Sequence, residues 1–325
     1  MKYCILLMPA LLVWLSGPSS AQQSNTSEAY SVDVNGNRVP YGPEIMQTKS
    51  DGNSTLTVSH QSINGGSAPL ERVEERVLKN DASERIVERV TQRYDPQGNP
   101  LPPEKETIDE QKHPDGSSTT QSTTSRTDIN GNLQVIEKTT TDTQLTSSGK
   151  TSQTVVERPS ADGLRTVERR EEVVVQQPSG YQSDSTTYRS DGNGGFQVAV
   201  RQTDEHTVNG AESSDNSAEY EIGPTGQLQL HTQTVTKTVT QPDGLKNSVV
   251  DIYSRDVPGT VNSPDSSLKL QEQQTISAAP GPNNTVVQTL SVRRPTVSSP
   301  GTLGPEQQIS QTVCQGDCKP QKAGP

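Results

Sequence analysis

The sequence predicts an all-β protein, a long antiparallel meander of about eight two-stranded repeats. Turn-forming glycines recur with a period of about 32 residues, and the segments between turns alternate and are rich in Val and Thr. Only 27% of the residues are hydrophobic and 3% aromatic, too few for the thick core of a layered globular domain. We therefore expect a largely single-layer or curled sheet with disordered termini.

The N-terminus has the pattern of a secretory signal peptide. Lys2 precedes an apolar run from Cys4 to Leu15, and Ser19-Ser20-Ala21 offers the small residues of a cleavage site. The run is shorter than the roughly 20 residues that span a bilayer. We expect residues 1–21 to be removed, leaving a secreted or periplasmic mature chain without a membrane span. A simple membrane anchor is the alternative.

The chain is acidic, with a formal net charge of −11. Nucleic acids and anionic membranes bind basic surfaces, so we expect neither as a partner. The low hydrophobic content keeps intrinsic disorder open as a rival interpretation. Against it, Val and Thr are abundant, and both favour strands.

Two interleaved families of turns define the repeat. The first contains Gly36, Gly65, Gly98, Gly131, Gly163, Gly194, Gly226 and Gly259, with successive spacings of 29, 33, 33, 32, 31, 32 and 33 residues. The second falls about midway, at Asp51-Gly52, Asn80-Asp81, Asp115-Gly116, Ser148-Gly149, Ser179-Gly180, Asn209-Gly210, Asp243-Gly244 and Pro264-Asp265. Asn-Gly and Asp-Gly favour tight hairpin turns. Residues 30–294 are therefore expected to form the hairpin repeats.

Both faces of the expected sheet carry charges. In Leu164–Val175, simple alternation puts Thr166, Glu168, Arg170 and Glu172 on one face and Arg165, Arg169 and Glu171 on the other. A sheet of roughly 16 strands also raises the alternative of an outer-membrane barrel. That alternative needs an apolar outer band with aromatic girdles, which this composition disfavours.

The segment from Leu70 to Arg93 is ambiguous. Leu70, Val73, Val77 and Leu78 have helical spacing, whereas the position of the segment in the repeat predicts strand. We favour strand.

Both ends of the mature chain are expected to lack regular structure. Residues 22–29 are interpreted as a flexible N-terminus, and residues 295–325 as a proline-rich, mostly disordered tail. The tail contains Cys314 and Cys318, for which export predicts a local disulfide. A catalytic redox pair or a crosslink between chains is the alternative.

No catalytic, cofactor-binding or metal-binding residues are assigned, and no cofactor is expected. His60, His113, His206 and His231 lack paired spacing, and we interpret them as exposed. The turns at Asp33 and Asp128 partly resemble a calcium loop, but hairpin capping explains the same residues. The segment Tyr94–Asn99 resembles one Tyr-Asp repeat of bacterial shell-forming toxins, and we carry no function over from it.

These patterns indicate an exported, non-enzymatic repeat protein with a structural or surface-interaction role in the cell envelope or outside the cell. Its partners are unknown, with envelope glycan or self-association as the expectations. A glycan- or calcium-binding module is the alternative, and an enzyme acting on envelope polymers is less favoured. Tyr94, Tyr188, Tyr220 and Tyr253 recur before successive turns, which favours glycan binding but also suits strand packing.

Overall fold

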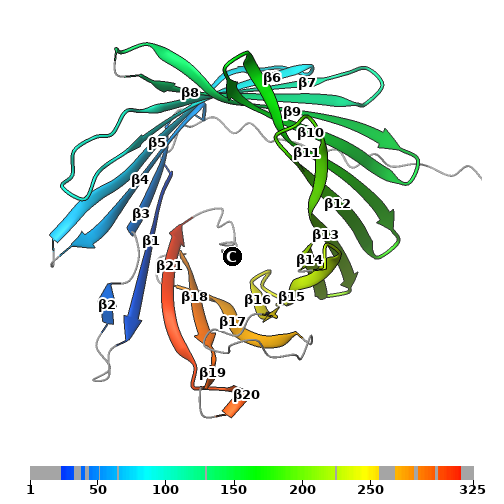
Figure 1. Cartoon of the computed structure of the whole chain (residues 1–325). Helices are drawn as coiled ribbons and strands as arrows, with labels where there is room; N and C mark the ends of the chain where they lie inside the picture. Colours follow the sequence, from blue (N-terminus) through cyan, green and yellow to red (C-terminus); the bar gives the residue numbers. More distant parts are fainter. Residues whose placement is uncertain are drawn as a thin grey trace, which may run out of the picture.

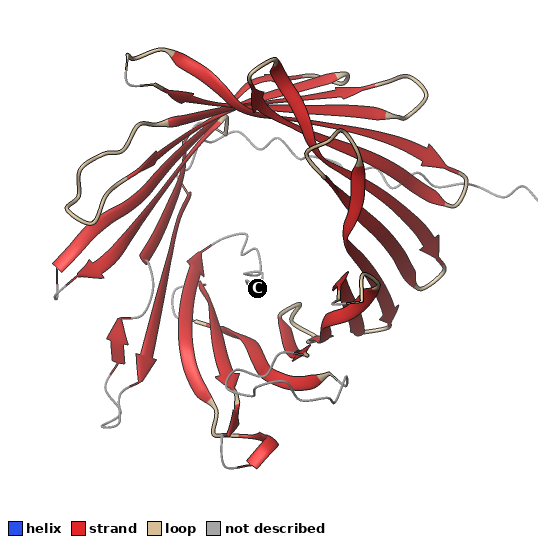
Figure 2. Cartoon of the chain, viewed as in Figure 1, coloured by secondary structure: helices blue, strands red, loops and turns tan. Residues whose placement is uncertain are grey.

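The computed structural model describes residues 23–32, 38–40, 44–50, 52–63, 66–128, 130–223, 225–255, 268–281, 285–296 and 299–315. The expected signal peptide, Gly36, Gly65, Gly259 and Cys318 lie outside these residues. The described chain is all-β, as the sequence predicts (Figure 2). Within it, no helix is long and apolar enough to cross a membrane.

The strands follow one another along the chain (Figure 1). They are β1 (Gln23–Val32), β2 (Arg38–Pro40), β3 (Glu44–Ser50), β4 (Ser54–Ile63), β5 (Gly66–Asn80), β6 (Glu84–Arg93), β7 (Glu104–Lys112), β8 (Ser118–Thr127), β9 (Leu133–Thr146), β10 (Gly149–Ser160), β11 (Gly163–Gln177), β12 (Gly180–Ser190), β13 (Phe196–Asn209), β14 (Glu212–Ile222), β15 (Leu228–Thr240), β16 (Lys246–Ser254), β17 (Lys269–Pro280), β18 (Thr285–Arg293), β19 (Pro295–Thr296), β20 (Ser299–Leu303) and β21 (Gln307–Gln315).

Consecutive strands from β3 to β18 pair antiparallel, which confirms the hairpin meander. The sheet curls so far that its ends meet. Strand β21 pairs with β18 on one side and with β1 on the other, and β1 pairs in turn with β3. Figure 1 shows the resulting ring of strands, in which β1 and β21 lie side by side.

The two turn families lie at opposite ends of the strands. Turns of the first family connect, for example, β8 to β9 and β12 to β13, whereas those of the second connect β9 to β10 and β13 to β14. Gly131 and Gly210 illustrate the requirement for glycine, because their φ angles are 83° and 61°. The turn chemistry of the sequence thus fixes the length of each strand.

A β-bulge recurs close to the first-family turns. The extra residue is Ile136 in β9, Val167 in β11, Ala199 in β13 and His231 in β15, since in each case two neighbouring pairs skip that position. Bulges increase strand twist and bend the sheet. Their regular recurrence accounts for a sheet that curls evenly.

The ambiguous segment is strand, as favoured, in β5 and β6. Its helical spacing has a structural cause. Strand β5 contains two bulges, one that skips Leu70 and one that skips Leu78. The bulges break the alternation, so that the apolar positions acquire a spacing typical of a helix.

The expected face assignment in Leu164–Val175 is wrong for two residues, Arg165 and Thr166. Because Val167 is bulged, Arg165 shares a face with Glu168, Arg170 and Glu172, while Thr166 lies on the other. Charges still occupy both faces, so the interpretation of two polar faces is unaffected.

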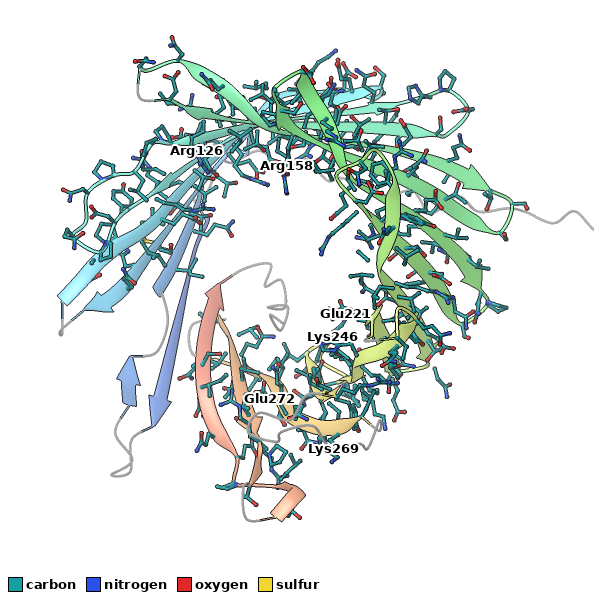
Figure 3. The ribbon with its side chains drawn as sticks, in the orientation of Figure 1. Arg126, Arg158, Glu221, Lys246, Lys269 and Glu272 are labelled. Atoms are coloured by element: carbon teal, nitrogen blue, oxygen red, sulfur yellow. The ribbon has the colours of Figure 1, made fainter. Side chains whose placement is uncertain are left out.

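Cross-strand register divides the sheet into an inner and an outer face. Of the five most buried apolar residues, four share one face: Val87, Val174, Val250 and Val292, each at most 7% exposed. On that same face Arg158, Glu221 and Lys246 project toward the middle of the ring (Figure 3). We call it the inner face. Its crowding follows from curvature, which brings side chains together on the concave side.

Where the sequence predicts ends without regular structure, the described residues 23–29 and most of 295–315 lie in strands. Residues 23–29 belong to β1, and residues 307–315 form β21. The prolines that favoured disorder flank β21 and are absent from it, and its backbone completes the ladders of two edge strands.

Candidate functional site

Aspartates cap several of the first-family turns. In the turn after β8, Asp128 Oδ1 accepts hydrogen bonds from the backbone N–H groups of Asn130 and Asn132, both 2.8 Å. Asp95 Oδ1 accepts the equivalent bonds from Gln97 and Asn99. The backbone bond from Asn132 holds the pKa of Asp128 below its usual value.

This geometry bears on the resemblance of these turns to calcium loops. Asp128 Oδ2 also accepts a bond from the amide of Gln134, at 2.9 Å. Both carboxylate oxygens therefore stabilise the hairpin itself, which supports capping over cation binding. Within the described residues, no group of three or more His, Cys, Asp or Glu side chains is arranged to hold a metal ion.

A repeated ion pair runs along the inner face, close to the bulges. A glutamate on the first strand of a pair contacts an arginine 21 or 22 residues later, on the next strand or, for Arg294, directly after it. The pairs are Glu71–Arg93, Glu104–Arg126, Glu137–Arg158, Glu168–Arg189 and Glu272–Arg294. These pairs were not predicted from the sequence, although Glu71, Glu104 and Glu137 recur with the same 33-residue spacing as the glycines Gly65, Gly98 and Gly131.

Further along the strands, ion pairs link more than two strands. Arg89 on β6 contacts Glu75 on β5 at 3.0 Å and Glu106 on β7 at 2.8 Å. Ser122 on β8 donates a hydrogen bond of 2.6 Å to Glu106. Four consecutive strands are thus joined by side chains as well as by their backbones.

The inner face becomes acidic where the repeated pair is interrupted. On β13 and β14, Val200 pairs with Glu221 at the position that holds glutamate and arginine in other repeats. Asp204, Asp215 and Glu219 lie on the same face of these two strands. Among the described inner-facing residues of β13 and β14, none is Lys or Arg.

A hollow of about 420 Å³ lies beside this acidic part, across β10 to β14. Most of its lining residues belong to the inner face, and they include Lys150, Glu172, Tyr181, Asp204 and Asp215. It combines an aromatic ring with both hydrogen-bond donors and acceptors. Polar side chains and an aromatic ring thus converge here on one open space.

The recurring tyrosines lie on the outer face and form cross-strand pairs with aliphatic residues. Tyr188, Tyr220 and Tyr253 pair with Val198, Leu230 and Leu270, respectively. Tyr94 is displaced from this series. Arg93 is the partner of Glu71 as Arg189 is of Glu168, so Tyr94 corresponds to Ser190 rather than to Tyr188.

The four histidines do not converge. His206 Nδ1 lies 2.6 Å from Asp215 Oδ1, His231 Nδ1 lies 4.0 Å from Glu221 Oε2, and His113 Nε2 lies 3.2 Å from Thr119 Oγ1. His60 lies on β4. The backbone of Cys314 belongs to β21, opposite Val286. Because Cys318 lies outside the described residues, the expected disulfide stays a prediction.

No protein-family model and no curated protein matches the chain. Among solved structures, CdiB from Acinetobacter baumannii is similar with a TM-score of 0.40 and 9% sequence identity. The match covers 90% of this chain and 59% of the CdiB chain, and so weak a likeness carries no argument about function.

Proposed function

We propose that the chain is an exported, non-enzymatic β-repeat protein with a structural or surface-interaction role in the cell envelope or outside the cell. The observation that carries this proposal is the repetition of polar side chains in register on a continuous sheet. The inner ion pairs recur from β5 to β12 and again at β17. A surface that repeats its hydrogen-bonding groups suits a polymer or another copy of itself as partner.

The outer face supports the same proposal. It carries ion pairs of its own, such as Arg201 with Asp184 and Lys105 with Glu88. It also carries exposed aliphatic residues near the first-family turns, among them Leu133 at 60% and Leu164 at 44% exposed. Polar and apolar groups are therefore both available to a partner outside the ring.

Export rests on the leader pattern of residues 1–21, which predicts a periplasmic or secreted location. An enzyme acting on envelope polymers is disfavoured because the described histidines are dispersed over β4, β13, β15 and the turn after β7. Of the binding alternatives, glycan is favoured over calcium. The turn carboxylates already accept backbone hydrogen bonds, whereas the hollow across β10 to β14 offers hydrogen-bond donors and acceptors beside an aromatic ring.

Cell fractionation followed by co-sedimentation with isolated envelope polymer tests this proposal. We expect the mature protein outside the cytoplasm, and we expect it to sediment with the polymer without releasing new reducing ends. Retention in the cytoplasm, or failure to sediment with any envelope fraction, contradicts the surface-interaction role. Release of reducing ends that depends on the protein supports the enzyme instead.

A further inference from the structure

The hollow across β10 to β14 is built from two adjacent rows of cross-strand partners. One row runs Lys150, Val174, Ser183, Asp204, each opposite the next. The neighbouring row runs Gln176, Tyr181, His206, Asp215. The volume of the hollow, about 420 Å³, falls in the range of small-molecule sites, roughly 300–1,000 Å³.

The second row provides a rigid aromatic surface. The rings of Tyr181 and His206 are stacked, with centroids 5.3 Å apart and an interplanar angle of 24°. The contact of 2.6 Å between His206 Nδ1 and Asp215 Oδ1 holds the imidazole in place. Tyr181 nevertheless stays 36% exposed, so its ring is accessible from the hollow.

Donors and acceptors surround this ring. Asp204 is held by hydrogen bonds from Ser183, at 3.1 Å, and from the amide of Gln202. Lys150 and Glu172 face the same space and form no ion pair within the described part of the chain. A carboxylate only accepts hydrogen bonds and an ammonium only donates them, so a ligand here must do both.

We propose that this hollow binds a saccharide unit of an envelope or extracellular glycan. A pyranose presents an apolar C–H face that packs on an aromatic ring, and its hydroxyl groups both donate and accept. Tyr181 provides the ring, Asp204 and Glu172 accept, and Lys150 donates. The carboxylates of the lining, Glu172, Asp204, Glu205 and Asp215, outnumber Lys150 and would also attract an organic cation, so a polyamine is included in the test.

This inference rests on the proposed surface-interaction role, for which it names the ligand class. It also separates Tyr181 from the recurring tyrosines. Tyr188 lies on the same strand, but on the outer face, opposite Arg169 and Val198. The two tyrosines therefore provide a matched pair of substitutions.

Isothermal titration calorimetry of the mature full-length protein tests the site. The probes are cellotetraose, chitotetraose and soluble glycan fragments of peptidoglycan. We expect at least one probe to bind, Tyr181→Ala to weaken its affinity about tenfold or more, and Tyr188→Ala to leave it unchanged. Asp204→Asn, which keeps the shape of the side chain, is expected to weaken binding as well. Circular dichroism of each variant establishes that it is folded.

Three results overturn the proposal: none of the probes binds at millimolar concentration, Tyr188→Ala weakens binding as much as Tyr181→Ala, or spermidine binds with the same dependence on Tyr181. Co-sedimentation distinguishes this failure from failure of the proposed function. If wild type and Tyr181→Ala sediment equally with envelope polymer, the surface role stands and the site is wrong. If a probe binds at Tyr181 but wild type does not sediment, the site stands and the proposed role is wrong.

Discussion

Glu137 Oε2 and Arg158 Nε lie 2.9 Å apart across β9 and β10, and their contact recurs in four other strand pairs. Arg158 is 60% and Glu137 37% exposed, so water screens the pair, and an energy of about 0.2–1 kcal/mol is expected. These repeated ion pairs contribute mainly by favouring the observed strand register, because a strand displaced by one residue would break the pair.

Reversing the charge at Arg158 should therefore lower stability only slightly, and reversing the charge at Glu137 as well should restore it. We expect Arg158→Glu to lower the free energy of unfolding by about 1 kcal/mol, since it replaces attraction by repulsion with Glu137. The double variant with Glu137→Arg should recover most of the loss. Urea unfolding measures both. A double variant no more stable than Arg158→Glu alone would show that the pair makes no contribution.

Two turn glycines should respond very differently to alanine. A Cβ at Gly180 would lie 1.8 Å from the carbonyl oxygen of His206, so the backbone of β12 or β13 must move. At Gly210 a Cβ meets nothing within 4 Å, and the cost is the positive φ alone, about 1–2 kcal/mol. Hydrogen exchange should show lost protection on both strands for Gly180→Ala and only local change for Gly210→Ala. Equal loss of protection in the two variants would contradict the close approach of Gly180 to the carbonyl oxygen of His206.

Acid should weaken the turns below about pH 4. The pKa of Asp95 is lowered mainly by a hydrogen bond from the Asn99 side chain, and that of Asp115 mainly by one from the Ser117 side chain. Backbone hydrogen bonds, above all from Asn132, lower the pKa of Asp128. A carboxyl group with a lowered pKa stabilises the fold fully above its unfolded value of about 3.9, and this stabilisation is lost as pH falls through the folded value.

Urea unfolding between pH 2 and 7 measures this dependence, over a range chosen to bracket the carboxyl pKa of about 3.9. For Asp128→Asn we expect a shallower fall in stability below about pH 4 than for wild type. If stability falls equally steeply with decreasing pH in both proteins, Asp128 does not contribute to the acid sensitivity.

Removing β21 should open the ring. Truncation before Gln307 leaves β18 and β1 without their shared neighbour, and unpaired edges associate with other chains. We expect lost exchange protection in Thr285–Arg293 and concentration-dependent association in analytical ultracentrifugation. A matched truncation after Gln315 keeps β21 and should behave as wild type. Unchanged protection in β18 without β21 would contradict the pairing.

The turns could be predicted from the sequence because their chemistry is local. Gly131 needs its positive φ whatever the rest of the chain does, and Asp128 caps a turn formed by its immediate neighbours. Ring formation could not be predicted in this way. Thr26 pairs with Val313, and no local pattern records a contact between residues so far apart. The prolines near β21 also favoured disorder, although they lie outside the strand.

The bulges explain the wrong faces of Arg165 and Thr166, because alternation assigns faces correctly only while the period of two holds, and Val167 shifts it within β11. The candidate site was missed for a different reason. The convergence of Lys150, Tyr181 and Asp204 depends on the registers of three successive strand pairs, which the sequence does not display. The repeated Glu71 and Glu104 could have been found from their spacing alone.

The regular bulge makes each hairpin a module that turns the sheet by a similar increment. Insertion or deletion of one whole hairpin unit, such as β12–β13, would preserve the pairing rules of its neighbours while changing the circumference of the ring. Gene duplication could therefore enlarge or shrink the molecule in steps of one hairpin, without new local chemistry. Homologues of this chain should differ in length by multiples of its period of about 32 residues.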